Sequence, residues 1–340
     1  MRIFRHTAGL PDAVRGGVVT IGNFDGVHLG HQEVIGAAAR EAERRGGMMT
    51  VVTFEPHPRR FFRADDPPFE LTPLRSKVRW LRAIGVETLQ LVHFDADMSQ
   101  ASAADFVQSL LIDGLDARHV VVGYDFVFGH GRKGNIDTLR GLSDGGAFGL
   151  TAVDPVSAEN GPVYSSTNIR GYLRTGDPLG AAGLLGRCWE IEGRVQMGDQ
   201  RGRTIGFPTA NIPIDDYVEP ALGVYAVWAG IERDGATEWH MGSANIGHRP
   251  TFDGEGVVLE VYLFDFTDDI YNQLLRVALV DYIRPERKFD GIPQLREQIA
   301  LDCGAARKLL ESIQPGDLRG PPGQARAARG VGQLKMAGLI

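Results

Sequence analysis

The stretch Gly17-Val-Val-Thr-Ile-Gly-Asn-Phe-Asp-Gly-Val-His-Leu-Gly-His31 sets the pattern for the first half of the chain. Its first five residues are typical of a buried strand, and the glycine-rich residues that follow are typical of a tight loop leading into a helix. The same alternation predicts strands at 48–54, 88–94 and 119–123 and helices at 31–45, 75–84 and 103–112. Runs such as Val120-Val-Val122 are continuously apolar, as in a parallel sheet covered on both faces. The pattern predicts a doubly wound α/β domain, in which ligands bind beyond the carboxyl ends of the strands.

The second half of the chain has a different pattern of predicted secondary structure. Beyond about residue 186, strands are predicted without intervening helices, at 189–197, 223–229, 239–245, 257–264 and 274–282. Closely spaced strands with Gly and Pro turns indicate an antiparallel barrel or sandwich, and a barrel is favoured because it leaves no open edges. One closing helix is predicted from residues at helical spacing: Ile292, Leu295, Ile299, Cys303, Ala306 and Leu310. We expect domains at 1–186 and 187–313, and a disordered tail at 314–340 that is rich in Gly, Pro and Ala.

Composition excludes several classes of protein. The 340 residues are 43% hydrophobic and 23% charged, as in ordinary globular chains. There is no apolar run of membrane-spanning length and no secretory signal pattern, while Cys188 and Cys303 form neither a disulfide framework nor a zinc motif. A net charge of −7 argues against a general nucleic-acid binder. We expect a cytoplasmic protein with small-molecule partners and neither nucleic acid nor membrane, and the sequence leaves a transient homo-oligomer open.

The motif His28-Leu-Gly30-His31 indicates an anion site. It lies where the loop after the first strand enters a helix, so both imidazoles can face an anion held by the free N–H groups of that helix. The alternatives are a metal-binding pair or a coincidence of surface residues.

The motif Tyr164-Ser-Ser166-Thr167-Asn-Ile-Arg170 supplies hydroxyls at a helix start and a guanidinium one turn later. Standing alone, it could be a plain helix cap. Together with the His-x-Gly-His motif, on an α/β domain that lacks the Walker A and Gly-x-Gly-x-x-Gly patterns, it resembles the nucleotidyltransferase superfamily. Members of that superfamily attack the α-phosphate of a nucleoside triphosphate and expel pyrophosphate.

Two further segments at strand ends narrow the substrate: Phe54-Glu-Pro-His57-Pro58 and Gly123-Tyr-Asp125-Phe-Val-Phe128-Gly129. Aromatic and proline walls beside polar groups suit a flat heteroaromatic ligand, although each Phe ring singly could equally belong to the core. Taken together, the four segments are similar to the FMN adenylyltransferase module of the bacterial bifunctional riboflavin kinase/FAD synthetase family, over about residues 15–185.

That resemblance implies a Rossmann-like nucleotidyltransferase domain with catalytic roles for His28 and His31. It implies nucleotide or phosphate contacts at Gly22, Asn23, Phe24, Gly30, Ser166, Thr167 and Arg170. It also implies flavin contacts at His57, Pro58, Asp125 and Phe128.

The second domain opens with a glycine-rich segment, residues 193–211. Its glycines let the backbone approach phosphates closely, and Thr209 with Asn211 supplies two hard oxygen ligands of the kind that Mg²⁺ accepts. The glycines alone could form a hairpin. The string Gly206-Phe-Pro-Thr-Ala-Asn211, however, closely resembles the riboflavin kinase signature, which implies nucleotide contacts at Gly198, Arg203 and Gly206.

Glu260, in the predicted strand 257–264, matches the catalytic base of riboflavin kinases. A carboxylate at the mouth of a barrel can accept the proton of a primary alcohol that attacks a γ-phosphate, whereas the alternative is a solvated outward position. Arg284 and Phe289 match a stretch that lies over the flavin, although each could be a surface residue. The chain departs from the family at Tyr262, commonly His, and at Tyr271-Asn272, commonly Tyr-Gly.

These resemblances imply an enzyme with two sites. The barrel would use ATP and Mg²⁺ to convert riboflavin to FMN, and the α/β domain would use a second ATP to convert FMN to FAD and pyrophosphate. Two alternatives remain open: a single-activity enzyme with one degenerate site, and a flavin-responsive binding or regulatory protein that uses its tail to contact a partner.

Overall fold

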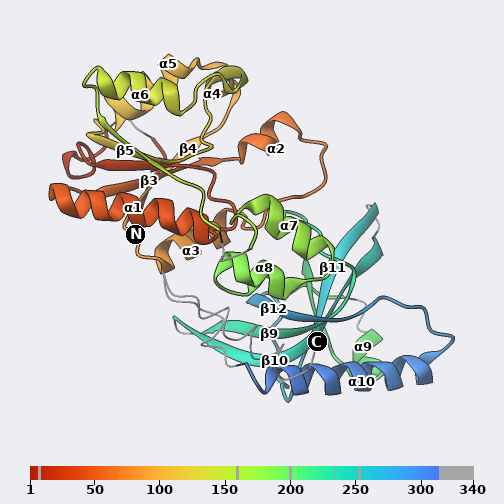
Figure 1. Cartoon of the computed structure of the whole chain (residues 1–340). Coiled ribbons are helices and arrows are strands. Elements are labelled where there is room, and N and C mark those ends of the chain that lie inside the picture. The colour runs from red at the N-terminus through yellow and green to blue at the C-terminus, as the bar shows by residue number, and fades with distance from the viewer. Residues whose placement is uncertain (7–8, 158–160, 199–200, 234, 252–253, 314–340) are drawn as a thin grey trace. The chain divides into compact units, whose positions relative to one another are not determined.

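A computed structural model describes residues 1–340 except 7–8, 158–160, 199–200, 234, 252–253 and 314–340. The predicted disordered tail therefore lies outside the described residues. The described chain forms two compact units (Figure 1), the first from Met1–Pro67 and Leu74–Tyr164, and the second from Pro68–Pro73 and the chain from Ser165 onward.

The first unit is a six-stranded parallel sheet with helices on both faces. Its strands are β1 (Arg2–Phe4), β2 (Val18–Ile21), β3 (Met49–Glu55), β4 (Thr88–His93), β5 (His119–Gly123) and β6 (Gly149–Val153). Its helices are η1 (Asp12–Val14), α1 (Leu29–Arg45), α2 (Pro58–Phe62), α3 (Leu74–Ala83), α4 (Ala96–Gln100), α5 (Ala103–Phe106), the π-helical η2 (Val107–Gly114), η3 (His130–Arg132) and α6 (Ile136–Asp144).

The strand order β1-β4-β3-β2-β5-β6 defines where a ligand binds in this unit. From β2 the chain proceeds to β3 on one side, and it later returns to place β5 on the other side. The loops after β2 and β5 therefore diverge at the switch point, where doubly wound sheets bind ligands beyond their carboxyl ends.

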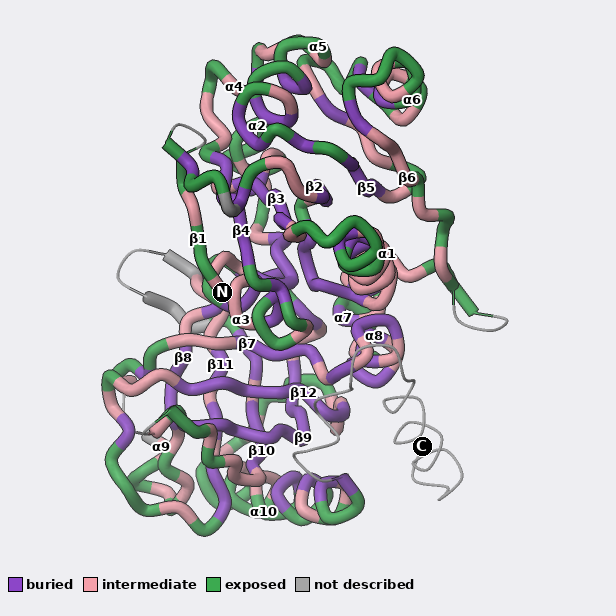
Figure 2. The backbone as a smooth tube through the Cα atoms, turned by 90° about the vertical axis from the view of Figure 1, so that its left-hand side faces the viewer, coloured by how far each residue is buried: buried purple, intermediate pink, exposed green. Residues whose placement is uncertain are grey.

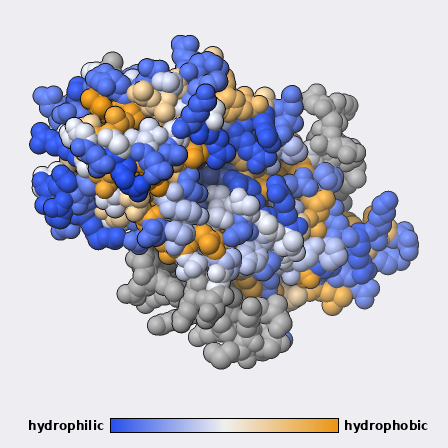
Figure 3. Space-filling view, turned by 45° about the horizontal axis from the view of Figure 1, so that its top comes forward, coloured by the Kyte–Doolittle hydropathy of each residue, from blue (hydrophilic) through white to orange (hydrophobic). Residues whose placement is uncertain are grey.

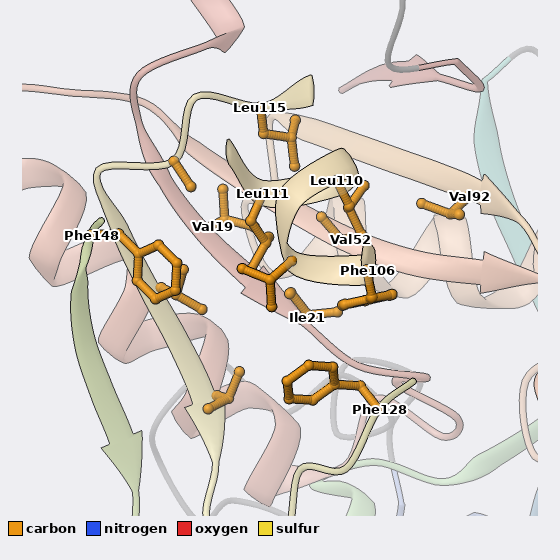
Figure 4. Close-up of a cluster of buried hydrophobic side chains, with 14 of the residues drawn as sticks. Val19, Ile21, Val52, Val92, Phe106, Leu110, Leu111, Leu115, Phe128 and Phe148 are labelled. Atoms are coloured by element: carbon orange, nitrogen blue, oxygen red, sulfur yellow. The ribbon is translucent and has the colours of Figure 1, made fainter. Parts of the chain in front are cut away.

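Both faces of this sheet are buried, which explains the continuously apolar strands. Val19, Val52 and Val120 point into a cluster with Phe106 and the residues of η2 (Figure 4). The next residues along the same strands, such as Val51 and Val121, belong to clusters with α1 and α3 on the opposite face. The tube view shows the four central strands β2, β3, β4 and β5 buried along most of their length, whereas the edge strands β1 and β6 are more exposed (Figure 2). The predicted doubly wound architecture is confirmed.

The second unit is a six-stranded antiparallel sheet in the order β7-β12-β9-β10-β11-β8. Its strands are β7 (Trp189–Arg194), β8 (Ala210–Pro213), β9 (Gly223–Arg233), β10 (Ala236–Thr251), β11 (Gly254–Leu263) and β12 (Leu274–Pro285). Its helices are α7 (Ser166–Arg174), α8 (Pro178–Leu185), α9 (Arg201–Thr204) and α10 (Ile292–Leu310).

The antiparallel sheet curves toward closure. A single bridge between Gln196, just beyond β7, and Asn211 of β8 joins its two edges, and the Gln196 N–H donates to the Asn211 carbonyl at 2.8 Å. The buried side of α10 packs Cys303, Ala306 and Leu310 into a cluster with β9 and β12. This is the closing helix that the periodicity predicts.

Some element boundaries differ from the sequence predictions. The predicted helix 103–112 is divided into a short α5 and the π-helical η2, and the predicted strand 239–245 is the middle of the longer β10. The compact unit that contains the antiparallel sheet also includes α7 and α8. The boundary between functional domains at residue 186, predicted from the sequence, stays a prediction.

On the face shown in Figure 3, hydrophilic residues cover most of the surface, and apolar residues form smaller patches between them. Within the described residues, no helix has the length and the apolar character that crossing a bilayer requires.

Candidate active sites

The loop between β2 and α1 holds the His-x-Gly-His motif in a fixed conformation. Phe24 and Val27 have left-handed backbone angles, with φ of 45° and 43°, which are unfavourable for residues with large side chains. Both side chains are buried in the cluster under α1 and α3, and that packing holds the unusual backbone in place. The loop therefore delivers His28 rigidly to the first turn of α1.

The two imidazoles lie together at the start of α1. The His28 ring Nδ1 accepts the backbone N–H of His31 at 3.2 Å, and the two rings stack with centroids 3.5 Å apart and planes inclined by 20°. Since Nδ1 accepts, the proton of the neutral His28 ring lies on Nε2. Phe24 packs edge-on against His31, with ring centroids 5.3 Å apart.

The second loop of the switch point follows β5. Asp125 is exposed there, whereas Phe128 is buried and packs against Phe106 and Phe126, with ring centroids 5.3 and 5.4 Å away. Figure 4 shows the Phe128 ring among the side chains of the core cluster. Core packing thus accounts for Phe128, and its contact with a flavin stays a prediction.

At the end of β3, His57 acts as a helix cap. Its Nδ1 accepts the Arg59 N–H at 3.1 Å, and Pro58 is the first residue of α2. Beyond them, Phe61 and Phe62 are exposed and pack edge-on against Phe94. The predicted flavin contacts of His57 and Pro58 remain predictions.

The Ser-Ser-Thr motif lies at the start of α7, and the residue that caps the helix is Ser165, which precedes the predicted contact residues Ser166 and Thr167. Ser165 is the N-cap, and its hydroxyl oxygen accepts the Asn168 N–H at 3.2 Å. Ser166 therefore lies in the first turn of the helix, where its N–H points out of the helix end. Arg170 donates from Nε to the Phe69 carbonyl at 2.7 Å. The predicted participation of this motif in one site with the imidazoles stays a prediction.

A cavity of about 330 Å³ opens at the glycine-rich start of the second unit. Gly198, Arg203, Thr209 and Asn211 all line it, so four residues predicted to bind nucleotide or metal share one cavity, whereas Gly206 is not among its lining residues. Two carboxylates that the sequence did not single out, Asp268 and Asp269, also line it. They lie in the turn that precedes β12, and only the folded sheet brings that turn to residues 198–211.

Gly198 is required by a close approach to Asn211. A Cβ atom at Gly198 would lie 2.6 to 2.8 Å from the side-chain amide of Asn211, closer than van der Waals contact allows. Asn211 is buried, and its Nδ2 donates to the Thr209 carbonyl at 3.3 Å, which directs the amide group beside Thr209.

A neighbouring cavity of about 250 Å³ contains Glu260. Strand register places Glu260 directly opposite Asn211 on one side and Asn245 on the other, so the three side chains share a face of the sheet. Thr209 lines both cavities. A half-buried carboxylate thus lies in a polar row beside the junction of the two cavities.

The wall of this second cavity is built by an ion pair and an aromatic ring. Arg284 donates to both carboxylate oxygens of the buried Asp302, with Nη2 to Oδ2 at 2.7 Å and Nε to Oδ1 at 3.0 Å. The Phe289 ring centroid lies 5.8 Å from the Arg284 guanidinium carbon. Sequence reasoning placed Arg284 and Phe289 in the site but missed Asp302, because that residue belongs to α10.

Tyr262 also lines the second cavity. Its ring packs edge-on against Phe207 at 5.4 Å, and burial raises the pKa of its hydroxyl. At neutral pH the phenol therefore stays protonated and presents a neutral hydrogen-bonding group.

Together these features define the class. One unit carries paired imidazoles at the switch point of a doubly wound sheet, and the other has a carboxylate at the junction of two cavities, one of them lined by a glycine-rich segment. These are the fold and the side chains that a transferase acting on nucleotide phosphates would need.

The comparisons with known proteins give the family. The FAD synthetase family model matches residues 10–168, and the riboflavin kinase model matches residues 185–310. The chain is 41% identical to the bifunctional riboflavin kinase/FMN adenylyltransferase of Bacillus subtilis, covering 87% of this chain and 93% of that protein. It is 39% identical to the Escherichia coli K12 protein of the same name, covering 93% of this chain and 100% of that protein.

A solved structure agrees over most of the chain. A crystal structure from Streptococcus pneumoniae, described as a macrolide-efflux protein, matches with a TM-score of 0.77 at 33% identity, covering 90% of this chain and 98% of that one. The chain belongs to the family of bifunctional riboflavin kinase/FMN adenylyltransferases. The expected enzyme class, with a riboflavin kinase and an FMN adenylyltransferase domain, is confirmed.

Proposed function

We propose that the chain catalyses the two reactions of its family at separate sites, riboflavin to FMN in the second unit and FMN to FAD in the first. The observation that carries the proposal is the position of Glu260. This carboxylate lies in one polar row with Asn211 and Asn245, beside Thr209, where two cavities of different character adjoin.

In the kinase site, the two cavities have distinct tasks. The glycine-lined cavity holds the phosphates of ATP near Arg203, and the cavity walled by Arg284 and Phe289 holds riboflavin. Glu260 accepts the proton of the primary alcohol as its oxygen attacks the γ-phosphorus. Thr209 and Asn211 offer neutral oxygens suited to Mg²⁺, which when bound neutralises charge on the phosphates.

In the adenylyltransferase site, a phosphate oxygen of FMN attacks the α-phosphorus of ATP and pyrophosphate leaves. The stacked His28 and His31 rings stabilise the charge that grows on the phosphates, assisted by the dipole of the 17-residue α1. We also propose nucleotide contacts for Ser166, Thr167 and Arg170 of α7. Neither reaction needs a covalent intermediate with the enzyme, so orientation and electrostatics carry both.

The proposal includes ATP and Mg²⁺ as requirements and small molecules as the partners. It retains the expectation of a cytoplasmic protein, supported by the two cysteines that remain free thiols.

The test is a single incubation of purified protein with riboflavin, ATP and Mg²⁺, with flavins resolved by chromatography over time. We expect FMN to appear first and FAD to follow, and neither to form when Mg²⁺ is withheld. Bound but unchanged riboflavin would identify a flavin-binding protein instead, and FMN without FAD would identify a single-activity kinase.

A further inference from the structure

Lys77 is a buried lysine that has no role in either reaction as described above. It is the fourth residue of α3 and has no exposed surface. Among the residues that the structure describes, its Nζ has no hydrogen-bond partner. Removing a primary amine from water without a partner is unfavourable in either protonation state, so a group of this kind calls for an explanation.

The topology places this amine at the ligand-binding edge of the sheet. α3 connects β3 to the parallel strand β4, so the helix runs opposite to the strands and begins at their carboxyl ends. Lys77 lies in the first turn of α3, and helical side chains tilt toward the N-terminus of their helix. The amine therefore extends toward the edge where the loops of the switch point lie.

The face of α3 that carries Lys77 covers the imidazole loop. Trp80 and Leu81, three and four residues further on, share that face and pack in one cluster with Phe24. Phe24 in turn packs edge-on against His31 at 5.3 Å. Lys77 thus lies on the helix face whose next turn packs against Phe24 of the imidazole loop.

We propose that the Lys77 ammonium binds a phosphate group of the nucleoside triphosphate in the adenylyltransferase site. The inference rests on the proposed FMN adenylyltransferase activity of the first unit. In that reaction a bond forms between an FMN phosphate oxygen and the α-phosphorus, the bond from the α-phosphorus to the bridging oxygen breaks, and pyrophosphate leaves with the electron pair.

The chemistry suits an ammonium group. Pyrophosphate gains negative charge as it departs, and Lys77 compensates that charge while keeping its proton. A lysine is a point charge on a flexible four-carbon stem, so the amine can move to a phosphate without displacing α3. A bound phosphate would give the buried amine the counter-charge that the described part of the protein does not provide.

The test compares Lys77→Met, which removes the charge at similar length, with Lys77→Arg, which keeps it. Arg82→Met is the matched control, because it removes an exposed charge from the same helix. Three readouts are needed: FAD formation from FMN and ATP, the reverse reaction of FAD with inorganic pyrophosphate, and the unfolding midpoint by calorimetry. FMN formation by the second unit serves as an internal control.

We expect Lys77→Met to lower the rate of FAD formation and of the reverse reaction by about 100-fold, since loss of one hydrogen-bond donor to the charge of a transition state typically costs about 10²–10³ in rate. Lys77→Arg should retain more activity than Lys77→Met, and the unfolding midpoint of Lys77→Met should be equal to or above that of the unaltered chain. Arg82→Met should form FAD and run the reverse reaction at the normal rates, and FMN formation should be normal in every variant.

The inference is overturned if Lys77→Met forms FAD at the normal rate, if it is at least as active as Lys77→Arg, or if its activity falls together with its unfolding midpoint. The last result would assign Lys77 to packing. Failure of the unaltered chain to form FAD would instead contradict the proposed function on which the inference rests.

Discussion

At the scale of single residues, His28 has two roles at once. Its ring accepts a backbone N–H as the cap of α1, and the same ring stacks on His31. Helix capping fixes the ring orientation, so the geometry of the imidazole pair is set by the helix that His28 caps. This coupling makes the small residue between the two imidazoles sensitive to substitution.

Gly30→Ala should disturb the imidazole pair. The added Cβ would lie 3.1 Å from the Tyr164 carbonyl oxygen and 3.2 Å from two atoms of the His28 ring, so that ring must shift. We expect FAD formation to fall about tenfold or more, because small displacements of catalytic groups are costly, while FMN formation is retained.

The control for this substitution is Gly36→Ala on the same helix. A Cβ there meets only the flexible end of Arg40, at 3.3 Å. Its activities should be normal, and helix propensity should raise the stability by about 0.5–1 kcal/mol. Equal FAD formation by the two variants would contradict the assigned role of the His28 ring.

Gly198→Ala should impair the kinase reaction. The substitution forces the Asn211 amide away from its position in the nucleotide cavity, so we expect a fall in FMN formation of about tenfold or more with normal FAD formation from supplied FMN. Gly304→Ala in α10, where a Cβ meets open space, is the control. The measurement is the steady-state rate of each reaction. Normal FMN formation by Gly198→Ala would contradict the proposed role of the Asn211 amide in the kinase reaction.

At the scale of elements, α10 does more than close the barrel. Its Asp302 receives the bidentate hydrogen bonds of Arg284 from β12, and Gln298 donates to the same carboxylate at 2.8 Å. The Arg284 guanidinium, which lines the second cavity, is therefore oriented by residues of α10.

Asp302→Asn should weaken flavin binding more than it slows chemistry. The amide cannot accept both Arg284 bonds, and the guanidinium loses its counter-charge in a partly buried position. We expect the KM for riboflavin to rise about tenfold with a smaller change in kcat, and FAD formation from supplied FMN to be unaffected. A normal KM would show that the orientation of Arg284 is not needed by the flavin.

A second link between elements joins β5 to α1 and β6. The His119 Nδ1 lies 2.9 Å from Nη2 of Arg45, and its Nε2 lies 2.8 Å from the Thr151 hydroxyl. Burial lowers the pKa of His119, against the opposing effect of the Glu41 carboxylate, whose Oε1 lies 3.4 Å from Nδ1. The neutral ring accepts the Arg45 N–H.

This depressed pKa predicts a pH dependence of stability. Below about pH 6.5 the unfolded chain protonates this histidine before the folded unit does, so the contribution of His119 is present above that pH and is lost as the pH falls. Heat inactivation of FAD formation should therefore become easier as the pH falls below about 6.5, and His119→Gln should flatten that slope. An unchanged slope in the variant would show that another group is responsible, and inactivation of FMN formation serves as the internal reference.

The sequence predicted which helices and strands form better than it predicted where they end or which side chains from different elements pair. Two-face burial makes Val18–Ile21 and Val120-Val-Val122 recognisable as parallel strands. The division of the helix after Ala103 depends on packing of η2 against the sheet, and no local signal marks it. The Arg284–Asp302 pair was missed because pairing between a strand and a helix is set by tertiary structure.

At the scale of the whole molecule, one chain forms two compact units, and we propose one reaction site on each. Local motifs revealed Thr209, Asn211 and Glu260 separately, but their gathering around adjoining cavities depends on strand register between distant segments. Lys77 went unnoticed because a lysine in an amphipathic helix ordinarily lies on the solvated face, and only burial distinguishes it.

The separation of the two reactions is the central claim, and it is tested most directly by crossing two variants with two substrates. His28→Ala and Glu260→Gln are each incubated with ATP and Mg²⁺ plus either riboflavin or FMN, and the flavins are separated by chromatography. The account predicts that His28→Ala accumulates FMN from riboflavin without forming FAD. It predicts that Glu260→Gln leaves riboflavin unchanged yet converts supplied FMN to FAD. Loss of both reactions in either folded variant would contradict it.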